Sequence, residues 1–174
     1  MSSRNAYTSF FKEHTECLTK GRYWLDEQYG VELGEPVCLH PTLTGYVGNP
    51  KNKRRIKSYD NATPGAEHAF GVSLDILYAS SGVDKDTLIL RPDHYYPREI
   101  AVMKIGICPI VNVATGYTAQ MDEKALPANG GAVGFGAPGA ATGVGLHYPL
   151  GKWLDETPAQ MPGLLYVNPM LEVL

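Results

Sequence analysis

Residues 100–107 read IAVMKIGI, and this stretch decides the fold class. A short, nearly continuous apolar run that ends before a proline, here Pro109, is typical of a buried β-strand. Residues 34–39 (GEPVCL), 69–74 (AFGVSL) and 163–167 (GLLYV) predict further strands. The chain of 174 residues contains 19 Gly and 13 Pro, which favour frequent turns. Short strands separated by turns predict a mainly β domain and argue against a helix bundle.

Two short motifs occur twice at nearly the same interval. Residues 44–47 (TGYV) recur 71 positions later as residues 115–118 (TGYT). Residues 70–74 (FGVSL) recur 72 positions later as residues 142–146 (TGVGL). Internal repeats of this kind indicate related structural units. We therefore expect a small β-barrel or β-sandwich built from two related units of about 70 residues, 31–98 and 99–174.

The first 30 residues differ from the rest of the chain. Their apolar positions follow a helical period, at Tyr7, Phe10, Phe11, His14, Cys17 and Leu18. The stretch predicts a helix that ends at Gly21, followed by the aromatic residues of the segment 22–29. This N-terminal segment is interpreted either as a helix packed on its own domain or as an arm that docks on a neighbouring subunit. For the arm, the candidate contacts are aromatic, namely Phe10, Phe11, Tyr23 and Trp24.

Charge limits the range of partners. The formal net charge of −3 excludes a globally basic nucleic-acid-binding protein. The single basic concentration is residues 51–57 (KNKRRIK), inside a long polar stretch, 48–67. It is interpreted either as a solvated loop or as a dock for an acidic protein surface, with Lys53, Arg54 and Arg55 as candidate contacts.

The sequence contains no convincing catalytic or metal-binding motif. The three cysteines lack metal-ligand or redox spacing, and the five histidines lack HxH or HExxH spacing. The pattern at 134–139 (GFGAPG) does not follow a buried strand, so it is not interpreted as a nucleotide site. The carboxylate pairs Asp84/Asp86, Asp122/Glu123 and Asp155/Glu156 are expected on the surface. Ser73, His68 and Asp75 form only a weak triad candidate. We expect no enzyme activity, no cofactor and no metal.

Neither a signal peptide nor an apolar stretch long enough to span a membrane is present, which predicts an unprocessed protein made in the cytoplasm with reduced thiols. A β enzyme of another type stays open, and would need a cleft that joins a carboxylate to two of four histidines. These are His40, His68, His94 and His147.

Four segments carry a resemblance to a known family. They are residues 34–37 (GEPV), 44–47 (TGYV), 66–74 (AEHAFGVSL) and 140–146 (AATGVGL). In this order they resemble the tailed-phage capsid decoration (cement) proteins over residues 31–174. The resemblance implies a β protein that binds the major capsid protein on the outer face of an icosahedral shell. It also implies a homotrimer that stabilises the virion, after synthesis in the host cytoplasm, without nucleic-acid or membrane partners.

A second class of function is kept as an alternative. Aromatic side chains on an exposed groove bind sugars by stacking, and the candidates here are Tyr95, Tyr96 and Trp153. The protein would then be a carbohydrate- or host-surface-binding module of a virion, such as a fibre or spike component.

Overall fold

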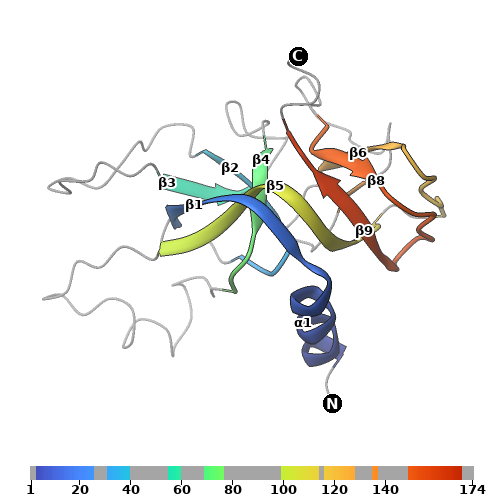
Figure 1. Ribbon diagram of the computed structural model, residues 1–174, viewed down its shortest axis with the longest axis horizontal. Coiled ribbons are helices and arrows are strands. Elements are labelled where there is room, and N and C mark those ends of the chain that lie inside the picture. Colours follow the sequence, from blue (N-terminus) through green and yellow to red (C-terminus); the bar gives the residue numbers. More distant parts are fainter. Residues whose placement is uncertain are drawn as a thin grey trace, which may run out of the picture.

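The protein is a mainly β domain with one short helix, as the sequence predicts (Figure 1). The computed structural model describes residues 3–25, 31–39, 55–59, 69–76, 99–113, 116–127, 135–136 and 149–169. In chain order its elements are α1 (Ser3–His14), β1 (Glu16–Leu25), β2 (Pro36–Leu39), β3 (Arg55–Ser58), β4 (Ala69–Ser73), β5 (Glu99–Val111), β6 (Lys124–Pro127), β7 (Phe135–Gly136), β8 (Gly151–Trp153) and β9 (Pro162–Val167).

The long strand β5 organises the curled sheet. At Gly106, one edge of β5 pairs with Cys17 of β1 and the other edge pairs with Val167 of β9. β5 also pairs with β4, so that the pairings β1–β3, β3–β2, β2–β4, β4–β5 and β5–β1 form a closed cycle of five strands. Beyond β9 the sheet continues through β8 and β6 to β7. Most of the pairs are antiparallel, and β1 and β3 run parallel.

Strand β5 extends further than the sequence predicts. The strand was expected to end before Pro109, but it continues to Val111. Beyond Ile107, β5 pairs only with β9 among the described residues. Proline lacks an N–H group, and a strand tolerates it where one edge needs no donor. Pro109 therefore lies in the strand opposite Leu164 without breaking it.

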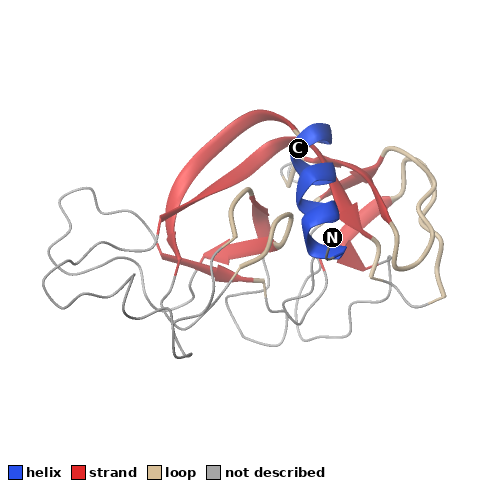
Figure 2. Cartoon of the chain, turned by 90° about the horizontal axis from the view of Figure 1, so that it is seen from below, coloured by secondary structure: helices blue, strands red, loops and turns tan. Residues whose placement is uncertain are grey.

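The N-terminal segment folds differently from the prediction. The helix ends at His14 instead of continuing through Leu18 to Gly21, and residues 16–25 form β1. The Thr15 hydroxyl donates a hydrogen bond to the carbonyl oxygen of Phe11 at 2.5 Å, where the helix gives way to the strand. Strand pairing with β5 outweighs the helical period, because tertiary partners override local propensity. Figure 2 shows α1 beside the curled strands.

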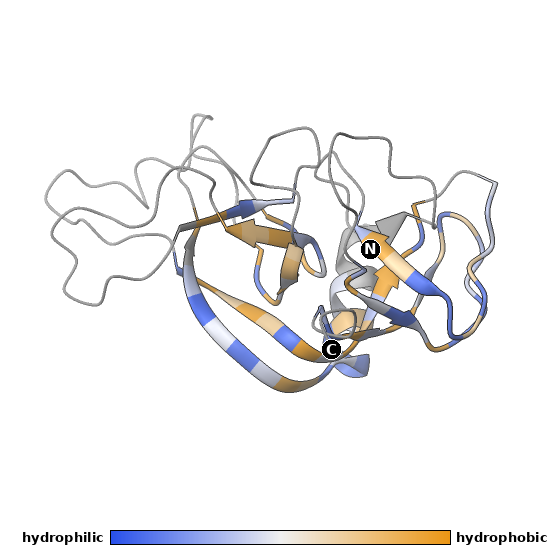
Figure 3. Ribbon diagram, turned by 90° about the horizontal axis from the view of Figure 1, so that it is seen from above, coloured by the Kyte–Doolittle hydropathy of each residue, from blue (hydrophilic) through white to orange (hydrophobic). Residues whose placement is uncertain are grey.

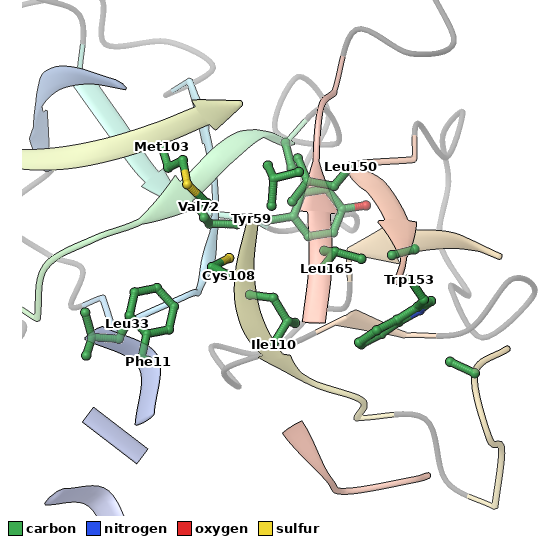
Figure 4. Packing of buried hydrophobic residues seen from close by; sticks show 14 residues of the cluster. Phe11, Leu33, Tyr59, Val72, Met103, Cys108, Ile110, Leu150, Trp153 and Leu165 are labelled. Carbon is green, nitrogen blue, oxygen red and sulfur yellow. The ribbon is translucent and has the colours of Figure 1, made fainter. Parts of the chain in front are cut away.

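Two apolar clusters form the core. One lies within the five-strand cycle, and all its buried members except Val31 come from strands of the cycle: Leu25, Val31, Val37, Ile56, Ile100 and Val102. The other is centred on β5, β8 and β9, and it includes Phe11, Met103, Ile110, Trp153 and Leu165 (Figure 4). β5 contributes to both clusters, so it joins the two halves of the domain.

Part of the predicted repeat lies on described residues. Gly71 and Val72 of the first Gly-Val motif are buried on β4. A Cβ atom at Gly71 would lie 2.5 Å from the carbonyl oxygen of Met103, so this glycine permits close contact between β4 and β5. Residues 44–47 and 142–146 lie outside the described residues.

Candidate functional site

Two loops at the end of the β8–β9 hairpin form a single tied unit, here called the loop platform: residues 116–123 and 154–161. Ala119 and Thr157 join them as an isolated antiparallel bridge. Each of these residues donates its N–H to the carbonyl oxygen of the other at 2.9 Å. A third hydrogen bond, from Asp122 N–H to the Trp153 carbonyl at 2.8 Å, fixes the first loop to the end of β8.

A buried asparagine connects both loops of the platform to the end of β5. Asn112 follows β5 directly and is fully buried. Its side-chain amide donates to the carbonyl oxygens of Tyr117 and Thr157, both at 2.9 Å. Its backbone accepts a hydrogen bond from Gln160 and donates one to Met161. Because a buried amide with satisfied partners specifies one arrangement, Asn112 makes the two loops rigid with respect to β5.

Two acidic side chains of the platform have structural roles. Glu123 accepts hydrogen bonds from the Tyr117 hydroxyl at 2.5 Å and from Gln120 N–H at 2.7 Å. The bond to Glu123 raises the pKa of Tyr117 to about 12. Asp155 accepts hydrogen bonds from the Thr157 hydroxyl and from Leu164 N–H. These carboxylates were expected in solvated surface pairs, but both accept hydrogen bonds from neighbouring residues of the chain.

The platform exposes large apolar side chains. Met121 is 64% exposed, Met161 is 53% exposed and Leu154 is 37% exposed. Exposed apolar side chains on well-ordered loops are typical of docking surfaces, because a preorganised surface loses little entropy on binding. Asp122 and Glu156 are exposed on the same loops. The exposed side chains of the two loops are thus apolar and acidic, which suits a partner with apolar and basic groups.

Sequence reasoning missed this surface, although the two loops share a short repeat. The triplet Ala-Gln-Met occurs twice, at 119–121 and at 159–161, and each copy ends in an exposed methionine. Each copy also adopts a positive φ in or next to the triplet, at Asp122 (65°) and Gln160 (63°). The positive φ falls at different positions relative to the two triplets, so the repeat alone does not predict the platform.

The two phenylalanines predicted for subunit contacts separate in the structure. Phe10 is 36% exposed on α1, with its ring centroid 4.5 Å from that of His14. Phe11 lies one position further along the helix and is buried in the core cluster with Leu33 (Figure 4). The prediction of Phe11 as a docking residue is therefore wrong, because its side chain is used to attach α1 to its own domain.

The other predicted contacts have mixed outcomes. Tyr23 is half-buried, with its ring 5.0 Å from Phe70 and 5.2 Å from the Lys104 ammonium nitrogen. Trp24 pairs through its backbone with Arg55 and Glu99. Arg55 begins β3, so the end of the basic run belongs to a strand instead of a loop. Lys53 and Arg54 lie outside the described residues.

The structure also bears on the triad and the sugar-binding groove that the sequence suggested. The Ser73 hydroxyl donates to the Asp75 carbonyl oxygen at 2.7 Å, and the Asp75 carboxylate accepts from Ala101 N–H at 2.7 Å. Both therefore stabilise the turn after β4, and their proposed triad partner His68 lies outside the described residues. Trp153 is fully buried, so its prediction as part of an exposed sugar-binding groove is wrong.

The cysteines and the other possible metal ligands do not gather into one site in the described part of the chain. Cys38 and Cys108 are buried, and burial raises the pKa of Cys108, whereas Cys17 is exposed. No group of three or more His, Cys, Asp or Glu side chains is placed to hold a metal ion within the described ranges. His40, His94 and His147, as well as Tyr95 and Tyr96, fall outside those ranges.

Comparisons with known proteins add no family assignment. The sequence matches no protein-family model, and no curated protein matches it. Among the residues that the structure describes, no helix is long and apolar enough to cross a membrane.

Proposed function

We propose that the protein decorates the outer surface of an icosahedral virus capsid and docks on the major capsid protein through the loop platform. The observation that supports this most is the set of exposed apolar side chains on rigidly tied loops: Met121, Leu154 and Met161. A shell-binding protein needs such a preorganised surface, because its affinity comes from many weak, identical contacts. The order of short motifs that resembles the decoration proteins supports the same function.

The assembly and the location of the protein follow the same resemblance. It would be made in the host cytoplasm, would add to the assembled shell as a homotrimer, and would stabilise the shell without catalysis or a cofactor. The two related units, 31–98 and 99–174, belong to the proposal, and Gly71 and Val72 on β4 represent the motif of the first unit. In this arrangement the platform contacts the shell.

Co-sedimentation with empty shells tests the proposal. Met121→Ser combined with Met161→Ser should weaken shell binding about tenfold or more, because truncated anchors at an interface centre commonly have effects of that size. Leu154→Ser should also weaken it. Phe10→Ser is the matched control, since Phe10 and Leu154 have nearly equal exposed fractions, 36% and 37%, on different elements.

The outcomes separate the competing interpretations. If Phe10→Ser still binds shells and the platform variants do not, the result supports docking through the loops. If the wild-type protein ignores shells, the capsid function is wrong. If the platform variants bind as tightly as the wild type while Phe10→Ser does not, the docking surface lies on α1 instead. Removal of residues 1–20 is unsuitable for this purpose, because it deletes buried Phe11 and half of β1.

A further inference from the structure

The first half of β1 is exposed in a way that the fold itself does not explain. Residues 16–20 are all exposed, and Leu18 is 72% exposed. One edge of β1 pairs with β5. On the other edge, the described residues pair with β1 only at Trp24 and Leu25, through β3. Figures 2 and 3 show β1 and β5 as concentric arcs at the margin of the molecule.

The pairing of β1 with β5 leaves Leu18 without an opposite residue. Cys17 pairs with Gly106 and Thr19 pairs with Ile105, so the register skips Leu18. A skipped residue of this kind is a β-bulge, which bends the strand locally. Leu18 also lies outside both core clusters. A large apolar side chain exposed at a bend, on an edge that pairs with no described residue at that point, is a candidate for contact with another molecule.

The charges along this edge are complementary when two copies of the edge lie antiparallel. If two copies of β1 lie antiparallel with Leu18 on a two-fold axis, Leu18 faces Leu18 of the second copy. In the same register, Glu16 of each copy faces Lys20 of the other, which gives two pairs of opposite charge. Neither Glu16 nor Lys20 forms an ion pair with a described residue of its own chain. Both are therefore available for this contact.

We propose that the edge of β1 over residues 16–20 is a self-association surface, where two copies of the chain pair antiparallel about a two-fold axis at Leu18. Lysine on an edge strand usually discourages pairing with another chain. Here each lysine would face a glutamate of the other copy, so the charges favour this one register. The bend at Leu18 limits the contact to a few residues, so the association is weak and depends on concentration.

This contact is distinct from the loop platform and from a trimer interface. A two-fold contact uses the same patch on both copies and closes after two subunits. It therefore produces dimers, or joins trimers in pairs, and cannot build a trimer by itself. The inference does not rest on capsid binding, because it is measured on the purified protein alone.

Charge reversal tests the register. Sedimentation of the full chain over a wide concentration range should show reversible association of the wild type in even multiples. Glu16→Lys alone, or Lys20→Glu alone, should weaken association about tenfold, because each change places like charges opposite one another twice in the dimer. The double variant Glu16→Lys with Lys20→Glu should restore it. Association that stays unchanged in the single variants, or is not restored in the double variant, overturns the proposal.

Cross-linking tests the position of the axis independently. In a Cys17→Ser background, Leu18→Cys should form a disulfide-linked dimer under mild oxidation, because directly opposed residues of antiparallel strands have Cβ atoms about 4.5–5.5 Å apart. Thr19→Cys in the same background is the matched control and should link poorly. A stronger link at position 19, a wild type that is monomeric at every concentration, or a trimer that associates no further would each overturn the proposal.

Discussion

Glu35 should make the stability of the protein depend on pH. It directly precedes β2 and is 3% exposed. Its carboxylate accepts a hydrogen bond from Glu32 N–H at 2.7 Å. Burial raises the pKa of Glu35 to about 7, and the nearby charge of Glu32 adds to the rise, although hydrogen bonds from the Glu32 backbone and the Ser58 side chain oppose it.

The sign of the effect follows from proton binding. In the unfolded chain Glu35 titrates near its ordinary pKa of 4.5, so between pH 4.5 and pH 7 the folded protein holds a proton that the unfolded chain has released. Stability falls with pH wherever the folded state binds more protons. The contribution is complete below pH 4.5 and is lost as the pH rises to about 7. A rise in pKa from 4.5 to about 7 corresponds to about 3 kcal/mol.

Glu35→Gln isolates this contribution, because it keeps the size of the side chain and an accepting oxygen but cannot ionise. The difference in unfolding free energy between the variant and the wild type should increase by about 3 kcal/mol in favour of the variant from pH 4.5 to pH 8. Urea unfolding followed by tryptophan fluorescence measures it. Glu32→Gln is the control, and it should reduce the pH dependence only in part. A difference that does not change with pH would refute the reasoning.

Two further predictions concern the platform and the contact between β4 and β5. Asn112→Ala should lower the free energy of unfolding by about 2–3 kcal/mol, because it removes the two hydrogen bonds that the buried amide donates to the carbonyl oxygens of Tyr117 and Thr157. An unchanged urea midpoint would contradict the role of Asn112. Gly71→Ala should be more destabilising than Gly116→Ala, because a Cβ at Gly71 would lie 2.5 Å from a backbone oxygen, whereas Gly116 has open space and only a φ of +69°, which costs about 1 kcal/mol. Equal losses in thermal unfolding would show that the close approach of β4 to β5 is not rigid.

Apolar runs in the sequence predicted several strands correctly. The segments 34–39, 69–74, 100–107 and 163–167 contain β2, β4, most of β5 and β9. These runs succeed because a strand buried between neighbours must be apolar along most of its length. The helix at the N-terminus was also predicted, although its end was not.

The sequence could not reveal β1 or the loop platform. β1 is exposed over residues 16–20, so its apolar pattern does not follow a strand period, and its partner β5 lies far away along the chain. The platform depends on Asn112, which the sequence places beside an apolar run with no sign of its two carbonyl partners. Both features are produced by long-range hydrogen bonding, which local patterns do not encode.

The two proposed surfaces lie on opposite sides of one strand. β1 pairs along one edge of β5, whereas β9 pairs along the other, and the platform is attached at the end of β5 through Asn112 and the β8–β9 hairpin. A molecule bound to the platform therefore need not displace a second copy paired with β1. Since both surfaces are fixed to the same strand, pairing at β1 would present two platforms in a defined relative orientation. Two platforms that can engage a repeating surface at the same time bind it more tightly than single ones without any new contact to it, and this is the physical advantage that self-association would give a protein that decorates a symmetric shell.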